Sequence, residues 1–164
     1  MVSKSSISRK RPLILVSIGS TDFKFLRVTK CLEKIDSHKY KVIGDFMPPD
    51  ELIKLIKKAD MIITHAGPGT LYLIAQHSRV MPLIIPRLSV LKEHVDDHQL
   101  YFAKYIQKQM QINVRKFFIY DVDPLLKINK YLIEDKKVNY LHKLFMYPSR
   151  NKIISYINKK INSL

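Results

Sequence analysis

The sequence has 164 residues and a mass of 19.3 kDa, a length that fits one compact domain better than several. Apolar residues make up 46% and charged residues 26%, which excludes wholesale disorder and a fibrous repeat. Cys31 is the only cysteine, so the sequence excludes an intramolecular disulfide and a cysteine-rich zinc site, and it favours a reducing compartment.

The formal charge of +15 is spread unevenly along the chain. Residues 1–12 carry +4, residues 13–112 carry +4 and residues 113–164 carry +7. Basic ends of this kind suit nucleic acid, anionic lipid or an acidic partner, and the charge alone does not choose among them.

Neither a membrane span nor a signal peptide is expected. The longest stretch without Asp, Glu, Lys or Arg, residues 61–78, contains two glycines and a proline and would make a poor membrane helix. The apolar run at residues 13–18 is too short for a signal-peptide core. We therefore expect the protein to stay in the cytoplasm.

Short apolar runs alternate with amphipathic segments from residue 13 to about residue 108. We expect strands at residues 13–18, 40–44, 61–64 and 82–86. We expect helices at residues 24–35, from 48–50 to about 59, from about 70 onward, and at about 97–108. This alternation predicts an α/β fold, a Rossmann-like open parallel sheet with helices on both faces.

The pattern weakens towards the carboxyl end of the chain. Residues 117–120 are a candidate last strand, and an apolar stripe in a basic segment predicts a further helix, with Ile153, Ile154, Ile157 and Ile161 on one face. We therefore divide the chain into a basic N-terminal extension (1–12), a Rossmann-like domain (13–120) and a basic helical C-terminal extension (121–164).

In an open parallel sheet, ligands bind beyond the carboxyl ends of the strands, so the loops that follow the four strands should converge there. Gly19 and Ser20 open the first of these loops. His65 opens the third, and residues 87–99 make up the fourth.

The loop after the third strand reads His-Ala-Gly-Pro-Gly-Thr, from His65 to Thr70. Gly67 and Gly69 allow the backbone to approach a ligand closely, and a helix that begins at about Thr70 would point its free N–H groups at that ligand. This arrangement is typical of a diphosphate site. The same residues also fit a plain tight turn with Thr70 as its N-cap, in which His65 makes only local hydrogen bonds.

A polar cluster lies around the start of the helix expected at about 97–108. Its members are Glu93, His94, Asp96, Asp97, His98 and Gln99. His94 and His98 are spaced like metal ligands, but the glutamate of a zinc-protease motif is missing. An N-cap by either aspartate and recognition of sugar hydroxyls by Asp and Gln are the other interpretations, and we expect no metal.

The order and spacing of these motifs resemble the C-terminal, donor-binding domain of glycosyltransferase family 28. The residues that carry the resemblance are the loop from His65 to Thr70, the strand that ends in Pro86 and Arg87, and residues 93–99, and it extends over roughly residues 13–109. More narrowly, the chain is similar to the single-domain soluble subunits of bacterial capsule and exopolysaccharide transferases. It is also similar to the corresponding subunit of the enzyme that adds the second N-acetylglucosamine to dolichol.

The resemblance implies one half of a GT-B glycosyltransferase that binds a UDP-sugar without a metal or other cofactor. Its implied diphosphate-binding residues are Gly19, Ser20, His65, Gly67, Gly69 and Thr70. Its implied sugar-binding residues are Asp96, Asp97 and Gln99. Further candidates for the cleft are Arg87, Glu93 and His94. Many relatives bind the ribose with a glutamate on the helix after the glycine loop, and Leu73 stands at that position here.

The resemblance also implies a partner, because a complete GT-B enzyme carries its acceptor site and catalytic base in a second domain. The partner would be a membrane-anchored acceptor-binding subunit that recruits this chain to the cytoplasmic face of a membrane. The expected function is then inverting transfer of a sugar from UDP-sugar to a lipid-linked acceptor in surface polysaccharide or glycolipid synthesis. The alternatives are a basic module that binds nucleic acid or anionic membrane, and a degenerate regulatory subunit in which Leu73 marks lost turnover.

Overall fold

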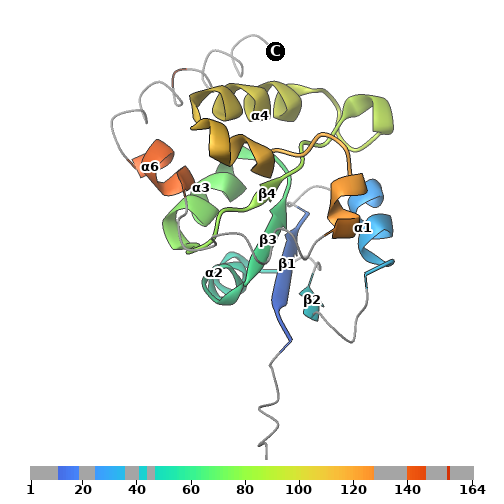
Figure 1. Ribbon diagram of the computed structural model, residues 1–164, viewed down its shortest axis with the longest axis vertical. Helices are drawn as coiled ribbons and strands as arrows, with labels where there is room; N and C mark the ends of the chain where they lie inside the picture. Colours follow the sequence, from blue (N-terminus) through green and yellow to red (C-terminus); the bar gives the residue numbers. More distant parts are fainter. Residues whose placement is uncertain are drawn as a thin grey trace, which may run out of the picture.

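The computed structural model describes residues 11–18, 25–35, 41–43, 47–127, 140–146 and 155. They form a parallel sheet flanked by helices (Figure 1). The elements are β1 (Leu13–Ser17), α1 (Leu26–Leu32), β2 (Lys41–Ile43), α2 (Pro49–Lys58), β3 (Met61–Thr64), α3 (Pro68–His77), β4 (Leu83–Ile84), η1 (Ser89–Leu91), α4 (His98–Gln109), η2 (Ile112–Phe117), η3 (Asp123–Lys127) and α6 (Tyr140–Met146). No helix among these residues is both long enough and apolar enough to cross a membrane.

The four strands lie in the order β2-β1-β3-β4, and all pairs are parallel. β1 is central, with Leu15 opposite Ile43 on one side and opposite Ile62 on the other. The predicted Rossmann-like open parallel sheet is therefore confirmed.

Each face of the sheet is covered by its own apolar core, because successive side chains of a strand point to opposite faces. Ile14 and Val16 of β1 face α1 and η3, where they pack with Val28. Leu15 faces the opposite side and belongs to the core formed with α2, α3, α4 and α6. Figure 1 shows α1 on one side of the strands and α2 and α3 on the other.

The predicted start of α2 is confirmed, and its sequence explains it. Pro49 occupies the first turn, where its missing N–H costs nothing. Asp50 and Glu51 lie in the first turn, while Lys57 and Lys58 lie in the last, as the helix dipole favours.

Several predicted elements differ in their bounds from those observed, and the strand expected at residues 82–86 is shortened to β4 (Leu83–Ile84). α1 ends at Leu32 rather than at residue 35, because the N–H groups that follow Glu33 bond three residues back instead of four, Lys34 to Cys31 and Ile35 to Leu32. The strand expected at residues 117–120 is reduced to one bridge between Ile84 and Phe118. The residues just before Phe118 form η2, so only a short stretch is extended.

The sequence did not predict α6, which packs against α3. Phe145 meets the ring of Tyr72 edge to face, with 6.3 Å between centroids, and His142 Nδ1 lies 3.0 Å from the carbonyl oxygen of Ala75. Leu141 is fully buried in the same core. The predicted isoleucine stripe at residues 153–161 lies outside the described residues, as do residues 1–10.

Burial of Leu141 predicts that α6 is part of the cooperative fold. Leu141→Ala should lower the free energy of unfolding by about 2–5 kcal/mol, because it leaves a cavity between α6 and α3. Leu126→Ala is the matched control, because that side chain is 53% exposed, and it should change stability by no more than about 0.5 kcal/mol. Urea unfolding of both variants measures the difference, and equal effects would mean that α6 does not belong to the core.

Candidate functional site

Between β1 and β3 the chain changes the side of the sheet on which it adds strands. The chain leaves β1 towards β2 at one edge of the sheet and leaves β3 towards β4 at the other. The loops after these two strands therefore diverge, and open α/β sheets bind ligands at such a switch point. Gly19 and Ser20, predicted for the first loop, lie outside the described residues. The described candidates come from the loop after β3 and from residues 87–99.

Residues 65–67 connect β3 to α3, and α3 begins at Pro68 with Gly67 as its N-cap. The predicted start at about Thr70 was wrong by two residues, because proline is preorganised for the first helical position. Gly69 and Thr70 consequently lie in the first turn of α3. Leu71 donates the first helical hydrogen bond, to Gly67 at 3.0 Å. The N–H groups of Gly69 and Thr70 precede it and have no acceptor within the helix.

The imidazole of His65 folds back over this turn. It is 4% exposed, its Nδ1 accepts a hydrogen bond from the N–H of Gly67 at 2.9 Å, and its Nε2 lies 3.4 Å from Thr70 Oγ1. Because Nδ1 is an acceptor, the ring hydrogen is on Nε2. His65 therefore presents a neutral N–H donor on the side of the first turn of α3.

The surroundings of His65 keep it neutral. The pKa of His65 is lowered to about 3, mainly by burial and next by the positive charge of Arg87. A side-chain hydrogen bond with Gln99 acts in the opposite direction, while His94 and His98 add smaller lowering effects. Protonation would also place a hydrogen on Nδ1 against the Gly67 N–H, which agrees with the direction of the shift.

The two glycines of the turn have different surroundings. A Cβ at Gly67 would lie 2.1 Å from Cε1 of His65 and 2.7 Å from its Nδ1, so a side chain there would displace the ring. A Cβ at Gly69 would meet nothing within 4 Å. Gly67 is thus required for the position of His65, whereas Gly69 leaves open space beside the first turn of α3.

Arg87 and Gln99 form a buried pair close to His65. Arg87 is 1% exposed and Gln99 is 2% exposed. The oxygen of the Gln99 amide accepts hydrogen bonds from the backbone N–H of Arg87 at 3.2 Å and from its Nε at 3.5 Å. Burial lowers the pKa of Arg87, and the carboxylate of Glu93 raises it. A guanidinium stays protonated under these conditions, so the site contains a buried positive charge.

Glu93 braces the loop that precedes α4. Both oxygens of its carboxylate accept a hydrogen bond from Arg27 Nε, at 3.1 and 3.0 Å. One of them, Oε2, also accepts a hydrogen bond from the N–H of Leu88 at 3.2 Å. Arg27 donates further to the carbonyl oxygens of Tyr120, at 3.0 Å, and Pro86. Sequence reasoning missed Arg27, because it lies 66 residues from Glu93 and nothing local marks the pair.

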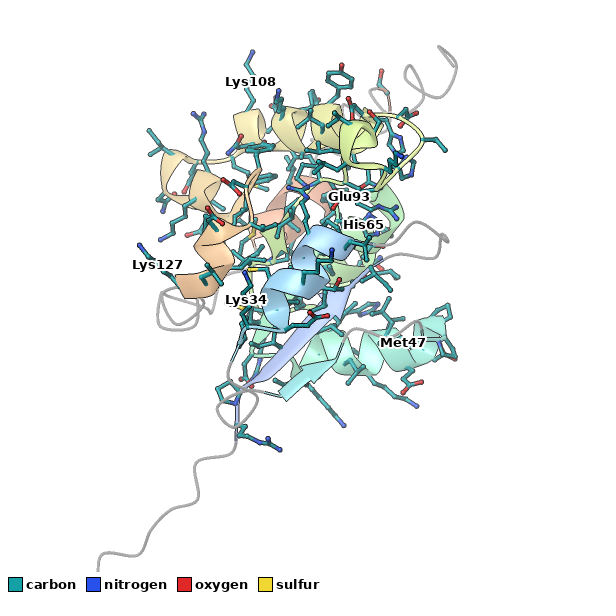
Figure 2. All side chains as sticks on the ribbon, turned by 90° about the vertical axis from the view of Figure 1, so that its right-hand side faces the viewer. Lys34, Met47, His65, Glu93, Lys108 and Lys127 are labelled. Atoms are coloured by element: carbon teal, nitrogen blue, oxygen red, sulfur yellow. The ribbon has the colours of Figure 1, made fainter. Side chains whose placement is uncertain are left out.

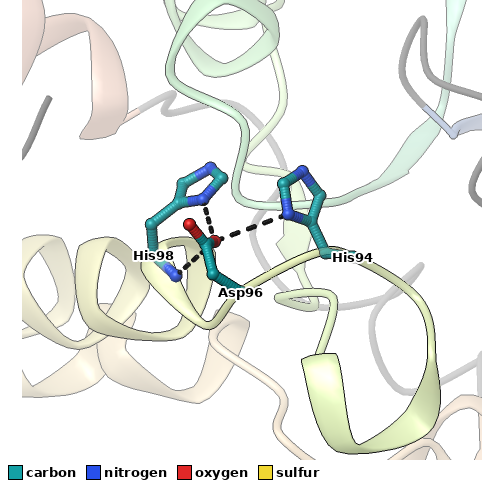
Figure 3. A group of neighbouring side chains, drawn as sticks. All are labelled: His94, Asp96 and His98. Atoms are coloured by element: carbon teal, nitrogen blue, oxygen red, sulfur yellow. Dashed lines mark hydrogen bonds and ion pairs between the residues drawn. The ribbon is translucent and has the colours of Figure 1, made fainter. Parts of the chain in front are cut away.

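The two aspartates before α4 have different partners. Asp97 Oδ1 accepts hydrogen bonds from the N–H and the hydroxyl of Ser89, at 2.8 and 2.9 Å. Asp97 occupies the N-cap position of α4, but its side chain makes no capping hydrogen bond. Asp96 Oδ1 instead accepts a hydrogen bond from the N–H of His98 at 3.1 Å. Asp96 also contacts the Nδ1 atoms of His98 and of His94, the latter at 3.5 Å (Figure 3).

The charges of Asp96 and His94 depend on each other. Burial raises the pKa of Asp96, but hydrogen bonds from His98 and the two imidazoles outweigh it, so the net shift is downward. For His94, burial lowers the pKa, His98 and Arg87 lower it further, and Asp96 acts in the opposite direction. At neutral pH we therefore expect a charged carboxylate beside a neutral His94.

The structure brings the two predicted clusters together. Arg87 and Gln99 both act on the pKa of His65, so the loop after β3 lies close to the start of α4, and Glu93 acts electrostatically on Arg87. Figure 2 shows His65 and Glu93 in the same part of the molecule. Leu73, which stands where relatives have a ribose-binding glutamate, packs against the core under α3. Ligand contacts of all these residues stay a prediction.

The neutral state of His65 predicts a specific loss of stability in acid. The unfolded chain takes up a proton near the ordinary pKa of 6.5, whereas the folded protein resists protonation down to about pH 3. Stability is therefore complete above pH 6.5 and falls as the pH decreases from 6.5 towards 3, by up to about 1.4 kcal/mol per pH unit. His65→Asn should remove this component, since the amide oxygen accepts the Gly67 N–H but does not titrate.

Urea unfolding at pH 7.5, 5.5 and 4.5 measures this component as the difference between the wild type and His65→Asn. The matched control is His77→Asn, in the last turn of α3, which should keep the wild-type pH dependence. A difference between wild type and His65→Asn that does not change with pH would contradict a buried neutral His65.

Comparison with protein families agrees with the resemblance to glycosyltransferase family 28 that the sequence motifs indicate. Residues 8–116 match the model of the glycosyltransferase family 28 C-terminal domain, which is well over half of the chain. No match was found among curated proteins or among solved structures. The matched segment includes the sheet, the turn after β3 and the polar cluster before α4. The chain therefore belongs to the glycosyltransferase family 28 C-terminal domain family, and glycosyl transfer is its general class of activity.

Proposed function

We propose that the chain is the donor-binding subunit of a two-subunit inverting glycosyltransferase that moves a sugar from UDP-sugar to a lipid-linked acceptor. The observation that carries the proposal is that the His65 turn lies close to the buried Arg87–Gln99 pair at the β1/β3 switch point of a family 28 domain. The expected class of product, a surface polysaccharide or glycolipid, is inferred only from the resemblance of the sequence motifs to those of known transferases.

The diphosphate of the donor would lie beside the first turn of α3. Gly69 and Thr70 offer N–H groups without helical acceptors, and Gly69 leaves room for close approach. The neutral Nε2–H of His65 adds a donor on the same side, and Arg87 adds a buried positive charge behind it. Such preorganised donors stabilise the negative charge that grows on UDP as the glycosidic bond breaks, without a metal.

The sugar would lie between this turn and the start of α4. Asp96 is 31% exposed at its side chain and is the accessible acceptor for hydroxyl groups, whereas Asp97 is engaged by Ser89. Gln99 is buried against Arg87 and would contact the sugar at its inner side. Gly19 and Ser20 would close the cleft from the loop after β1.

The acceptor and the catalytic base are assigned to a membrane-anchored partner subunit. The described residues form a single sheet with one switch point, whereas inverting transfer needs a base on the face of the sugar opposite the leaving UDP. The net charge of +7 over residues 113–164 suits docking on such a partner, or recruitment to the cytoplasmic face of an anionic membrane.

Gly69 offers a sharp test of donor binding. Gly69→Asp should weaken UDP binding by at least about tenfold, because like charges some 4 Å apart near a protein surface repel by about 4 kcal/mol. The fold should be unaffected or slightly stabilised, since the site is open and an acidic residue in the first helical turn is favourable. Calorimetric titration with UDP measures the affinity, and thermal unfolding measures the stability.

Asn113→Asp is the matched control, because it adds the same charge at an exposed position beyond the far end of α4. It should bind UDP like the wild type. The proposed function fails if the chain, alone and together with its partner, binds no UDP, or if Gly69→Asp binds UDP as tightly as Asn113→Asp.

Leu73 separates an active subunit from a degenerate one. Leu73 packs against the apolar core, so Leu73→Glu would put a carboxylate in apolar surroundings and should lower the free energy of unfolding by about 1–3 kcal/mol. If the wild type is an active subunit, the substitution should not raise the rate of transfer. Transfer of labelled sugar from UDP-sugar to a lipid acceptor, in the complex with the partner, measures turnover. Activity only in the Leu73→Glu variant would support a regulatory subunit instead.

A further inference from the structure

Three side chains before and within the first turn of α4 converge on one point. The Nδ1 atoms of His94 and His98 both approach Asp96 Oδ1, His94 at 3.5 Å and His98 as a hydrogen bond. One ligand atom from each of the three residues lies within 4.8 Å of the others. Figure 3 shows the two rings on either side of the carboxylate, both turned towards it.

The backbone holds these side chains through bonds that do not use the rings. The N–H of His98 bonds Asp96 Oδ1 at 3.1 Å, and Asp97 is tied to Ser89. Glu93, just before the cluster, is fixed by Arg27. The three groups are therefore held near each other before any ligand arrives, as a ligand-binding cluster requires.

Exposure of the three side chains suits the entry of an ion. The side chains of His94, Asp96 and His98 are 11%, 31% and 35% exposed, so the cluster reaches solvent without being fully hydrated. Two imidazoles and one carboxylate match the preferences of Zn²⁺ and neighbouring divalent transition metals rather than those of Mg²⁺ or Ca²⁺, which prefer oxygen ligands.

The distances are also compatible with a shared ion. Zn²⁺ binds imidazole nitrogen and carboxylate oxygen at about 2.0–2.2 Å, which places two ligand atoms roughly 3–3.5 Å apart. The separation of 3.5 Å between His94 Nδ1 and Asp96 Oδ1 fits this range. The closer contact of His98 is a hydrogen bond, whose proton the ion would replace.

We propose that His94, Asp96 and His98 form a three-ligand site for a divalent transition-metal ion such as Zn²⁺. Three protein ligands leave at least one coordination position for water or for an oxygen of a bound ligand. Both imidazoles lie near enough to His65 to act on it electrostatically, so the ion would stand at the rim of the proposed donor site. An oxygen of the UDP-sugar could fill the open coordination position. Only this statement about the UDP-sugar rests on the proposed function, and the proposed function does not need the metal.

The direct test is a titration of the full chain with Zn²⁺ against a chromogenic chelator, in the absence of nucleotide. The wild type should bind one ion per chain at this site. Asp96→Asn and His98→Asn should each weaken that binding by at least about tenfold. Asp96→Asn retains an oxygen for the His98 N–H, and circular dichroism checks that the fold is kept. His77→Asn, a histidine outside the cluster, is the matched control and should bind like the wild type.

Substitution with Co²⁺ gives an independent readout, because imidazole and carboxylate ligands produce visible d–d absorption that should disappear in both site variants. The proposal is overturned if micromolar Zn²⁺ does not bind, or if both site variants bind it as tightly as the wild type. UDP affinity measured in EDTA tests the proposed function separately. UDP binding without Zn²⁺ binding would reject the metal site and retain the donor site. Zn²⁺ binding without UDP binding would retain the metal site and reject the donor site.

Discussion

Parallel pairing of β1 with β3 is the constraint on which the site depends. Leu15 lies opposite Ile62 and Val16 opposite Ile63, and all four residues are buried between the two layers of helices. Because β1 leads to one edge of the sheet and β3 to the other, their following loops separate and leave a binding position between them. A shift of the register by one residue would turn every buried side chain of β3 to the other face, and the residues after β3 would be displaced with it.

Buried polar groups hold the rim of this position, and each of the main ones has a defined partner. Glu93 is matched by Arg27, Arg87 by Gln99, and the ring of His65 by the Gly67 N–H. Breaking a buried pair by removing one partner leaves an uncompensated charge, which is far more costly than losing a surface ion pair. The network therefore fixes the rim, and it leaves the N–H groups of the first α3 turn and the carboxylate of Asp96 facing outward as the groups that can meet a ligand.

Local patterns predicted most of the fold, and long-range contacts account for what they did not predict. β1 and β3 are short apolar runs because both of their faces are covered, and that signal is visible in sequence. The reduced strand around Phe118 and the packing of α6 on α3 depend on residues far apart in the chain, so no local pattern marks them. The start of α3 follows from the preference of proline for the first helical position, which favours Pro68 over a start at Thr70.

The candidate site was predictable to a similar extent. Glycines and polar residues after strands identified the two loops, and the structure places them close together, since Arg87 and Gln99 both act on the pKa of His65. The neutral state of His65, the steric reason for Gly67 and the role of Arg27 arise from packing in three dimensions. The approach of the His94 and His98 imidazoles to Asp96 also arises from packing in three dimensions. The spacing of four residues between the two histidines does not indicate which aspartate lies between their rings.

The central claim is that the turn after β3 and the start of α4 bind one nucleotide-activated sugar together. The most direct measurement is a set of amide nitrogen–proton correlation spectra of the isotope-labelled chain during titration with UDP and then with UDP-sugars. The account predicts saturable shifts of the Gly69 and Thr70 backbone amides on addition of UDP, and of the Gln99 side-chain amide when the sugar is present. Shifts confined to the basic segments outside residues 13–112, with both loops unchanged, would contradict it.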